Sequence, residues 1–486
     1  MSDETSAADF ERILVAADAA APALAETPPS VRAEWLDAAA DALDARADEL
    51  VELALAESHL TETRLRGELV RTTFQLRLFG DELRDGGYLR ATIDTADPDW
   101  PMGARPDLRL TVRPIGPVAV YAASNFPFAF SVAGGDTASA IAAGAPVVVK
   151  GNPGHPRVSA LTAEVFSGAL RSAGAPDGTF DIVYGLQTGS RLVVDARISA
   201  ASFTGSLAGG RALFDLATGR DHPIPFYGEL GSVNPAFVTP SAAEARADEI
   251  LNGFLGSVTL GVGQFCTKPG LLLLPASVDY APVVRRIVDE AGAQPMLNEH
   301  IRDGYLRALS TLAGHPAVRV VSGSEQGGID QAPTILTTTA GELLANADEL
   351  MTECFGPTAI IVTYDDPAEL LAVAGAIDGQ LTASVMGESD DELARRLVAL
   401  LAPSVGRVLW NGWPTGVSVT YAMQHGGPYP ATTSPATTSV GMAAIDRFVR
   451  PISYQNAPQD VLPPQLRDDN PWGVPQRVDG IRRSVR

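Results

Sequence analysis

Lysine and cysteine are the residues that this chain has least of. Its 486 residues contain two lysines and two cysteines, against 34 arginines. Cys266 and Cys354 lie far apart and match no metal-binding spacing, so the sequence predicts neither a disulfide framework nor a metal site. Cysteines that form neither disulfides nor a metal site are typical of proteins in the reducing cytoplasm, where we expect this protein.

Long apolar runs and targeting segments are also missing. The acidic start resembles neither a signal peptide nor a transit peptide, and the most apolar window, residues 116–135, is too polar to span a membrane. The net charge of −22 argues against nucleic acid and anionic membranes as partners. With 45% hydrophobic and 19% charged residues, the composition is that of a globular protein with two or three domains.

The order of patterns along the chain predicts the fold class. Residues 7–60 show helical apolar spacing, and residues 108–116 alternate as an antiparallel strand does. From 118 to 205 short apolar runs alternate with helical stretches, and a second alternation extends from about 234 to 425. This alternation predicts an α/β protein with parallel sheets. The Pro- and Asp-rich stretch after residue 455 predicts an extended tail packed on a neighbour.

A cysteine in a glycine-rich turn carries the first chemical signal. In "GQFCTKPG", residues 263–270, the glycines let a ligand approach the backbone, so Cys266 has the setting of an accessible nucleophile. A buried inert thiol is one alternative, and a Cys/His hydrolase with His425 of "QHGGPYP" as base is another. We expect Lys268 either to face solvent or to hold this loop and lower the thiol pKa.

Polar residues near the ends of apolar runs extend this site. Glu229, in "FYGELGSVNP", lies between aromatic residues and glycines, so we expect burial to raise its pKa, as suits a general base. Asn125 ends a strand where its amide can donate to an oxyanion, and Lys150 ends "PVVVK", where parallel sheets bind ligands. The loop 203–213 opens a helix suited to a pyrophosphate. For each of these residues and for the loop, the alternative to a functional role is that its polar groups are satisfied by local hydrogen bonds or by solvent.

Taken in order, these segments resemble the aldehyde dehydrogenase family. The resemblance covers nearly the whole chain and rests on "SNFPFAF", "PVVVKGNPGHP", "FTGSLAGG", "ELGSVNP", "GQFCTKPG" and "ECFGP". It implies an α/β fold with a Rossmann-like cofactor domain (1–91 and 115–230), an α/β catalytic domain (231–445) and a small antiparallel oligomerisation element with the C-terminal tail (92–114 and 446–486). It also implies a homodimer or homotetramer.

The same resemblance assigns catalytic roles. Cys266 would attack a small aldehyde to give a thiohemiacetal, while Asn125 and the Cys266 backbone N–H would hold its oxyanion. Hydride transfer would leave a thioester, and Glu229 would activate the water that hydrolyses it. A member that forms acyl-CoA is disfavoured by Glu229, and a non-catalytic member that retains the fold is disfavoured because all three residues are present.

Cofactor contacts follow from the resemblance as well. Lys150 would bind the adenine-side ribose, and Gly205 and Ser206 would lie beside the pyrophosphate. Glu353 would bind the nicotinamide ribose, with Phe355 against the nicotinamide end.

One departure from the family bears on the choice of cofactor. Many NAD-using relatives place a glutamate three residues after the strand-end lysine, and here that position is Pro153. Without an acid there to repel a 2′-phosphate, we expect NADP to be accepted at least as well as NAD. The candidates for binding that phosphate are Asn152, His155 and Arg211.

Three further segments narrow the choice of substrate. "GQFCTKPG", "NGWPTGVSVTYAMQHGGPYPATT" and "TTSVGMAAIDRFVRPISYQNAP" resemble the branch of 2,5-dioxovalerate and NADP-preferring fatty aldehyde dehydrogenases. The branch implies oxidation of 2,5-dioxovalerate to 2-oxoglutarate, with a medium- or long-chain fatty aldehyde as the alternative. A keto-acid substrate needs a cationic anchor, and Arg71 and Arg77 are the candidates unless nearby acids such as Glu68 and Asp81 neutralise them.

Overall fold

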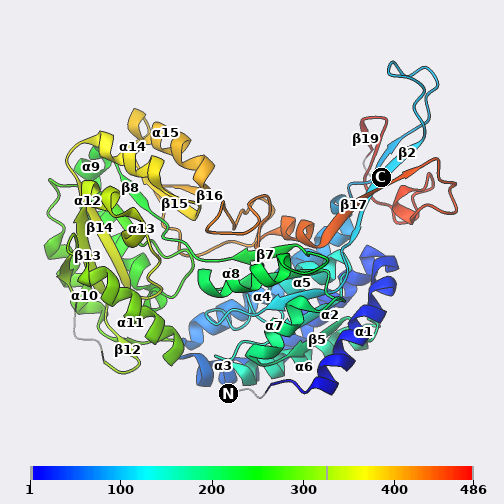
Figure 1. Cartoon of the computed structure of the whole chain (residues 1–486), viewed down its shortest axis with the longest axis horizontal. Coiled ribbons are helices and arrows are strands. Elements are labelled where there is room, and N and C mark those ends of the chain that lie inside the picture. The colour runs from blue at the N-terminus through cyan, green and yellow to red at the C-terminus, as the bar shows by residue number, and fades with distance from the viewer. Residues whose placement is uncertain (1–3, 324–326, 484–486) are drawn as a thin grey trace.

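The computed structural model of the chain describes residues 4–323 and 327–483, and it consists of two α/β lobes with an arm (Figure 1). Helices open the chain, as the apolar spacing predicts. Thr61 caps α4 by accepting a hydrogen bond from the Arg64 N–H, and Gly86 ends this helix in a left-handed conformation. These helices are α1 (Ala7–Glu26), α2 (Pro29–Ala45), α3 (Ala47–Ser58) and α4 (Glu62–Asp85).

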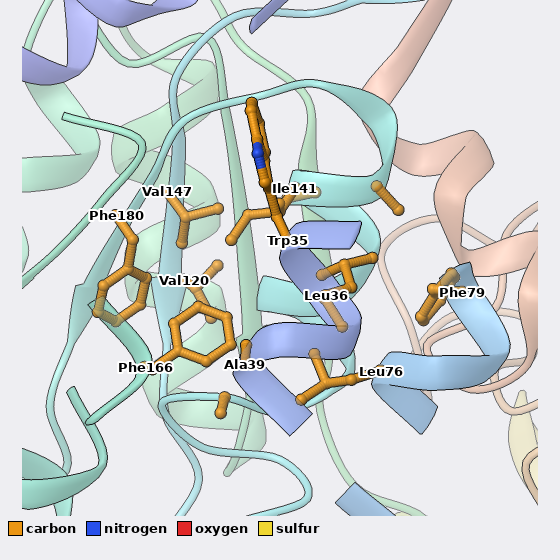
Figure 2. Packing of buried hydrophobic residues seen from close by; sticks show 14 of the residues in the cluster. Trp35, Leu36, Ala39, Leu76, Phe79, Val120, Ile141, Val147, Phe166 and Phe180 are labelled. Carbon is orange, nitrogen blue, oxygen red and sulfur yellow. The ribbon is translucent and has the colours of Figure 1, made fainter. Parts of the chain in front are cut away.

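The first lobe is built on a five-stranded parallel sheet in the order β5-β4-β3-β6-β7. Successive residues of β3 face opposite sides: Val118 and Val120 pack in one apolar cluster, and Ala119 and Tyr121 pack in another. Helices therefore cover both faces, and the cluster that includes Trp35 lies where α2 meets the sheet (Figure 2). The elements are β3 (Val118–Tyr121), α5 (Gly135–Ala143), β4 (Val147–Lys150), α6 (Pro156–Ser172), β5 (Phe180–Val183), α7 (Leu186–Val194), β6 (Ala200–Thr204), α8 (Leu207–Thr218) and β7 (Phe226–Glu229).

The second lobe contains a seven-stranded sheet in the order β11-β13-β14-β9-β8-β15-β16. Its pairs are parallel except for β11 with β13, at one edge. Strands β9 and β15 are buried along their whole length because helices cover both faces. The elements are β8 (Ala236–Val238), α9 (Pro240–Thr259), β9 (Leu271–Pro275), α10 (Ala281–Ala291), β10 (Gln294–Pro295), α11 (Glu299–Gly314), β11 (Arg319–Ser322), β12 (Asp330–Gln331), β13 (Thr334–Thr339), α12 (Ala340–Ala345), α13 (Ala347–Leu350), β14 (Thr358–Tyr364), α14 (Pro367–Ala376), β15 (Gln380–Met386), α15 (Glu392–Leu401) and β16 (Val405–Trp410).

The arm is a third sheet, in the order β17-β2-β1-β18-β19, which projects from the first lobe (Figure 1). Strand β2 is antiparallel to both of its neighbours, as its alternation predicts. The stretch after residue 455, expected to be an extended tail, instead returns in part to this sheet, where β18 pairs with β1. The strands are β1 (Thr92–Asp94), β2 (Leu108–Pro114), β17 (Val449–Gln455), β18 (Gln476–Val478) and β19 (Ile481–Arg483).

These three sheets confirm the predicted fold class. The strands of each large sheet fall within one of the predicted ranges, and the domain boundaries themselves stay predictions. None of the helices among the described residues has the length and the apolar character that a membrane span needs.

Candidate active site

The strand ends of the first sheet bring predicted site residues to one edge. Asn125 follows β3, Lys150 ends β4, Gly205 and Ser206 follow β6, and Glu229 ends β7. Because parallel strands all end at the same edge, the order β4-β3-β6-β7 places these residues side by side. This is the edge at which open α/β sheets bind their ligands.

The backbone just before Cys266 adopts a rare conformation. Gly261, Val262 and Gly263 have φ values of 54°, 57° and 64°, a left-handed region that a β-branched residue such as valine seldom adopts. Gly263 also allows a close approach, because a Cβ there would lie 2.2 Å from the carbonyl oxygen of Gly356. The glycines therefore let residues 261–270, here called the cysteine loop, pack against the "ECFGP" loop, residues 353–357.

Two buried side chains lie against the Cys266 thiol. His425 Nε2 is 3.6 Å from Cys266 Sγ and 3.1 Å from Glu229 Oε1. The other oxygen of Glu229 accepts a hydrogen bond of 2.7 Å from Ser439 Oγ. His425 is 1% exposed and Glu229 is 4% exposed, so water screens these contacts little. A proton that leaves the thiol therefore has an imidazole and a carboxylate within reach.

The pKa values of these groups are set by burial and by one another. Burial raises the pKa of the Cys266 thiol well above its usual range, and the charges of Glu229 and Glu353 raise it further. The thiol is therefore protonated at neutral pH and needs a base to become a nucleophile. Burial also acts to raise the pKa of Glu229, but the His425 charge and the hydrogen bonds from His425 and Ser439 outweigh it. The pKa of Glu229 is lowered, and the expectation of a raised pKa is wrong.

Asn125 points its amide toward the cysteine loop. Its Nδ2 donates to the carbonyl of Gln264 at 3.1 Å, two residues before Cys266, and its second amide proton remains for another acceptor. Arg64 Nη2 donates to the Asn125 carbonyl at 2.7 Å, and the Arg64 guanidinium lies over the rings of two phenylalanines. The position fits a donor to an oxyanion that forms at the thiol.

Lys268 is buried, so the expectation that it faces solvent is wrong. It is 4% exposed, and its Nζ donates to the carbonyls of Cys354 at 2.8 Å and Thr358 at 2.5 Å. Asn234 Nδ2 donates to the carbonyls of Cys266 and Lys268 from the other side. The lysine thus ties the cysteine loop to the "ECFGP" loop.

Glu353 is the first residue of the "ECFGP" loop. A Cβ on Gly231 would come within 2.4 Å of Glu353 Oε2, so the glycine makes room for this carboxylate. Burial raises the pKa of Glu353 to about 7, the Glu229 charge adds to the rise, and Lys268 opposes it. Phe355 is half-buried two residues further on.

The residues predicted to hold a dinucleotide present open donors. Ser206 Oγ caps α8 by accepting from the Gly209 N–H. In the described part of the chain, the N–H groups of Leu207 and Ala208 make no hydrogen bond, and both residues are exposed. A free helix N-terminus of this kind fits a pyrophosphate. Lys150 is half-buried, and its ammonium makes no hydrogen bond within the described residues.

The three candidates for a 2′-phosphate are already engaged. Both ring nitrogens of His155 lie 2.9 Å from partners, Ser159 Oγ and the Ala123 carbonyl, and its side chain is buried. Asn152 bonds to two backbone groups, and Arg211 is paired with Asp215 on α8. His155 is therefore excluded as a phosphate ligand in this conformation.

Arg71 and Arg77 have different surroundings although they share α4. Arg77 pairs with Asp41 and Asp44 at 2.6 and 2.7 Å at the surface, so it does not reach the site. Arg71 is half-buried over the ring of Phe130, and its buried Nη1 is without a hydrogen-bond partner among the described residues. Burial lowers the pKa of Arg71, whereas the charges of Glu68 and Cys266 raise it. Arg71 therefore lies near enough to Cys266 for their charges to interact, and it has an open donor.

Sequence reasoning considered His425 only as the base of a hydrolase and missed its contact with Glu229. The sequence signal that could have pointed to this contact is the setting of His425, which lies between a glutamine and two glycines in a segment rich in small residues. Atoms of Glu229, Cys266 and His425 that could bind a metal all lie within 4.8 Å of one another. They already contact one another, and the expectation of no metal site stays a prediction.

Comparison with known proteins identifies the family. The model of the aldehyde dehydrogenase family matches residues 2–429. The chain is 44% identical to alpha-ketoglutaric semialdehyde dehydrogenase 2 of Azospirillum brasilense, over 97% of this chain and 91% of that one. It is 43% identical to alpha-ketoglutaric semialdehyde dehydrogenase of Acinetobacter baylyi, over 94% of this chain and 88% of that one.

Solved structures agree with this assignment at the level of the fold. NAD-dependent aldehyde dehydrogenase from Sinorhizobium meliloti superposes with a TM-score of 0.78 at 22% identity, covering 93% of this chain and 87% of that one. Succinic semialdehyde dehydrogenase from Streptococcus pyogenes, solved with NADP+, gives a TM-score of 0.77 at 18% identity, covering 93% and 96%. The protein belongs to the aldehyde dehydrogenase family and is an NAD(P)-dependent enzyme that oxidises an aldehyde.

Proposed function

We propose that the protein oxidises 2,5-dioxovalerate to 2-oxoglutarate. The observation that carries this proposal is Arg71, a half-buried arginine over the Phe130 ring whose Nη1 is buried and unpaired and whose charge interacts with Cys266. In a chain of net charge −22, only a specific cation can hold an anionic substrate. The two relatives at 43–44% identity carry the name alpha-ketoglutaric semialdehyde dehydrogenase, which agrees with this choice.

The proposed chemistry assigns each step to a residue of the chain. Cys266 Sγ bonds to the aldehyde carbon after its proton passes to His425 or Glu229. Asn125 Nδ2 and the Cys266 backbone N–H hold the oxyanion of the thiohemiacetal. The chemistry that NAD or NADP would supply is acceptance of the hydride, which would leave a thioester on Cys266. Glu229 then takes a proton from the water that attacks this thioester, and the Cys266 thiol is released with the carboxylic acid.

The proposed cofactor contacts use Lys150 for the adenine-side ribose, Gly205 and Ser206 for the pyrophosphate, and Glu353 with Phe355 for the nicotinamide ribose and ring. The open N–H groups at the start of α8 support this placement. Both NAD and NADP are proposed to serve, since position 153 is a proline and places no charge of its own against a 2′-phosphate. A homodimer or homotetramer is proposed from the arm, whose strand β17 lies at a sheet edge.

Substitution of Arg71 tests the substrate. Arg71→Met should raise KM for 2,5-dioxovalerate about 10- to 100-fold, because a hydrogen bond to a charged group contributes about 1.5–3 kcal/mol. KM for hexanal, which has no carboxylate, should stay within about twofold. Arg77→Ala is the matched control, since that arginine lies on the same helix but pairs with acids at the surface.

Equal losses for both aldehydes in Arg71→Met would remove the anchor role. A higher kcat/KM for hexanal than for 2,5-dioxovalerate in the unmodified enzyme would favour the fatty aldehyde alternative. A Cys/His hydrolase, the third possibility that the Cys266–His425 contact raises, would act without any nicotinamide, so reduction of NAD or NADP, followed at 340 nm, would exclude it.

A further inference from the structure

Glu4 is a carboxylate to which the proposed chemistry gives no role. Its Oε1 accepts from the Gln187 N–H at 3.0 Å, and its Oε2 accepts from the N–H and the hydroxyl of Thr188 at 2.9 and 2.6 Å. Beside it, the Thr5 N–H donates to the Tyr184 carbonyl, and the Tyr184 N–H donates to Thr5 Oγ1. These contacts hold the start of the described chain against the turn between β5 and α7, with Glu4 at the N-terminus of α7.

Lys150, the last residue of β4, lies beside the same turn. In the sheet, Lys150 pairs with Val183, the residue that precedes Tyr184. A Cβ placed on Gly189 would lie 3.4 and 3.6 Å from Lys150 Cγ and Cε, and Gly189 directly follows Thr188. Lys150 and Glu4 thus flank the first turn of α7 from two sides. Burial lowers the pKa of Lys150, and the Glu4 charge acts against that shift.

The sequence argument for NADP rested on the absence of an acid after Lys150, where Pro153 stands. The structure brings an acid to the neighbourhood of Lys150 from a segment almost 150 residues earlier in the chain. A 2′-phosphate carries about two negative charges, and its natural partners here are the Lys150 ammonium and the positive end of α7. Glu4 already occupies that helix end.

We propose that Glu4 is a specificity-determining residue that disfavours a 2′-phosphate on the adenosine ribose and so limits NADP relative to NAD. The proposal rests on Lys150 being at that ribose, as proposed above. It does not depend on which aldehyde is oxidised. Without the Glu4 charge, Lys150 and the α7 N-terminus can bind the 2′-phosphate of NADP more strongly. NAD has a hydroxyl in place of that phosphate, so its affinity should increase little.

Binding of the two adenosine halves tests this directly. The probes are 2′,5′-ADP for NADP and 5′-AMP for NAD, titrated calorimetrically into the unmodified protein, Glu4→Gln, Glu4→Asp and Glu34→Gln. Glu4→Gln should bind 2′,5′-ADP about three- to tenfold more tightly, with 5′-AMP unchanged within about twofold. Glutamine keeps an oxygen that accepts from α7, so the segment stays in place. Glu4→Asp should keep the original ratio, and Glu34, an exposed residue of α2, is the control.

Two further results bear on the proposal. The gain for 2′,5′-ADP should shrink at high salt, because Glu4 is exposed and its field is screened. If Glu4 only caps α7, Glu4→Gln will change the affinity for both nucleotides by the same factor, and an unchanged ratio overturns the proposal. Failure of both nucleotides to bind any variant overturns it together with the placement of Lys150, and it leaves the substrate proposal, tested through Arg71, unaffected.

Discussion

His425 is the residue that most changes the chemistry expected of this site. Its Nε2 lies within 3.6 Å of the thiol and 3.1 Å of Glu229, so the thiol and the water do not have to share one base. The high pKa of Cys266 makes such a base necessary, and the low pKa of Glu229 keeps that carboxylate ionised at neutral pH. We therefore expect thiol activation and thioester hydrolysis to be separable by mutation.

Glu229→Gln should separate them. A first-turnover burst of NAD(P)H should survive because His425 Nε2, which no longer donates to a carboxylate, can accept the thiol proton, while steady-state turnover falls about 10²- to 10⁴-fold because hydrolysis loses its base. Stopped-flow absorbance at 340 nm measures both phases. Cys266→Ala, the control, should lose both phases and still bind cofactor. An unchanged steady-state rate would contradict the assignment, and a lost burst would show that Glu229 activates the thiol.

Glu353 gives cofactor binding a pH dependence. Its pKa is raised to about 7, so the carboxyl gains a proton as the pH falls from 8 to 6. A neutral carboxyl accepts hydrogen bonds from ribose hydroxyls less strongly, so the Kd for NAD should increase over this range. Fluorescence titration of the Cys266→Ala protein measures Kd without turnover. Glu353→Gln should bind weakly at every pH, and an equally steep pH dependence in that variant would refute the role.

At the scale of elements, two loops behave as one unit. The cysteine loop and the "ECFGP" loop meet where Gly263 lies against Gly356, and Lys268 joins them through two backbone carbonyls. The strands and helices around them were predictable because apolar runs and periodicity are local properties. The inward direction of Lys268 was not, because its acceptors lie 86 and 90 residues further along the chain.

Lys268→Met should therefore destabilise the protein without removing a catalytic group. The change leaves two buried carbonyls without a donor, each at a cost of about 1–3 kcal/mol. Arg77→Ala, which removes an exposed cation, should cost less than about 1 kcal/mol. Thermal denaturation of the two variants makes the comparison. A Tm for Lys268→Met equal to that of Arg77→Ala would contradict the structural role of this lysine.

Over the whole molecule, the site is assembled from segments that span most of the chain. The ends of β3 and β4 could be predicted, since parallel strands finish at one edge, and so Asn125 and Lys150 were expected there, whereas the strand that Glu229 ends, β7, was not predicted. The contact of Cys266 with His425 joins residues 159 positions apart, and no local pattern encodes such a long-range contact. Glu4 was missed for the same reason, and so the premise that no acid lies near Lys150 failed.

The scarcity of lysine has a consequence for an enzyme that works on an aldehyde. Aldehydes condense with free primary amines, and surface lysines are the usual source of such amines in proteins. Here Lys268 donates its protons to carbonyls inside the fold, Lys150 is half-buried at the edge of the first sheet, and the sequence contains no other lysine. Positive charge at the surface is carried by arginine, so the folded chain offers its own substrate almost no side-chain amine with which to form a Schiff base.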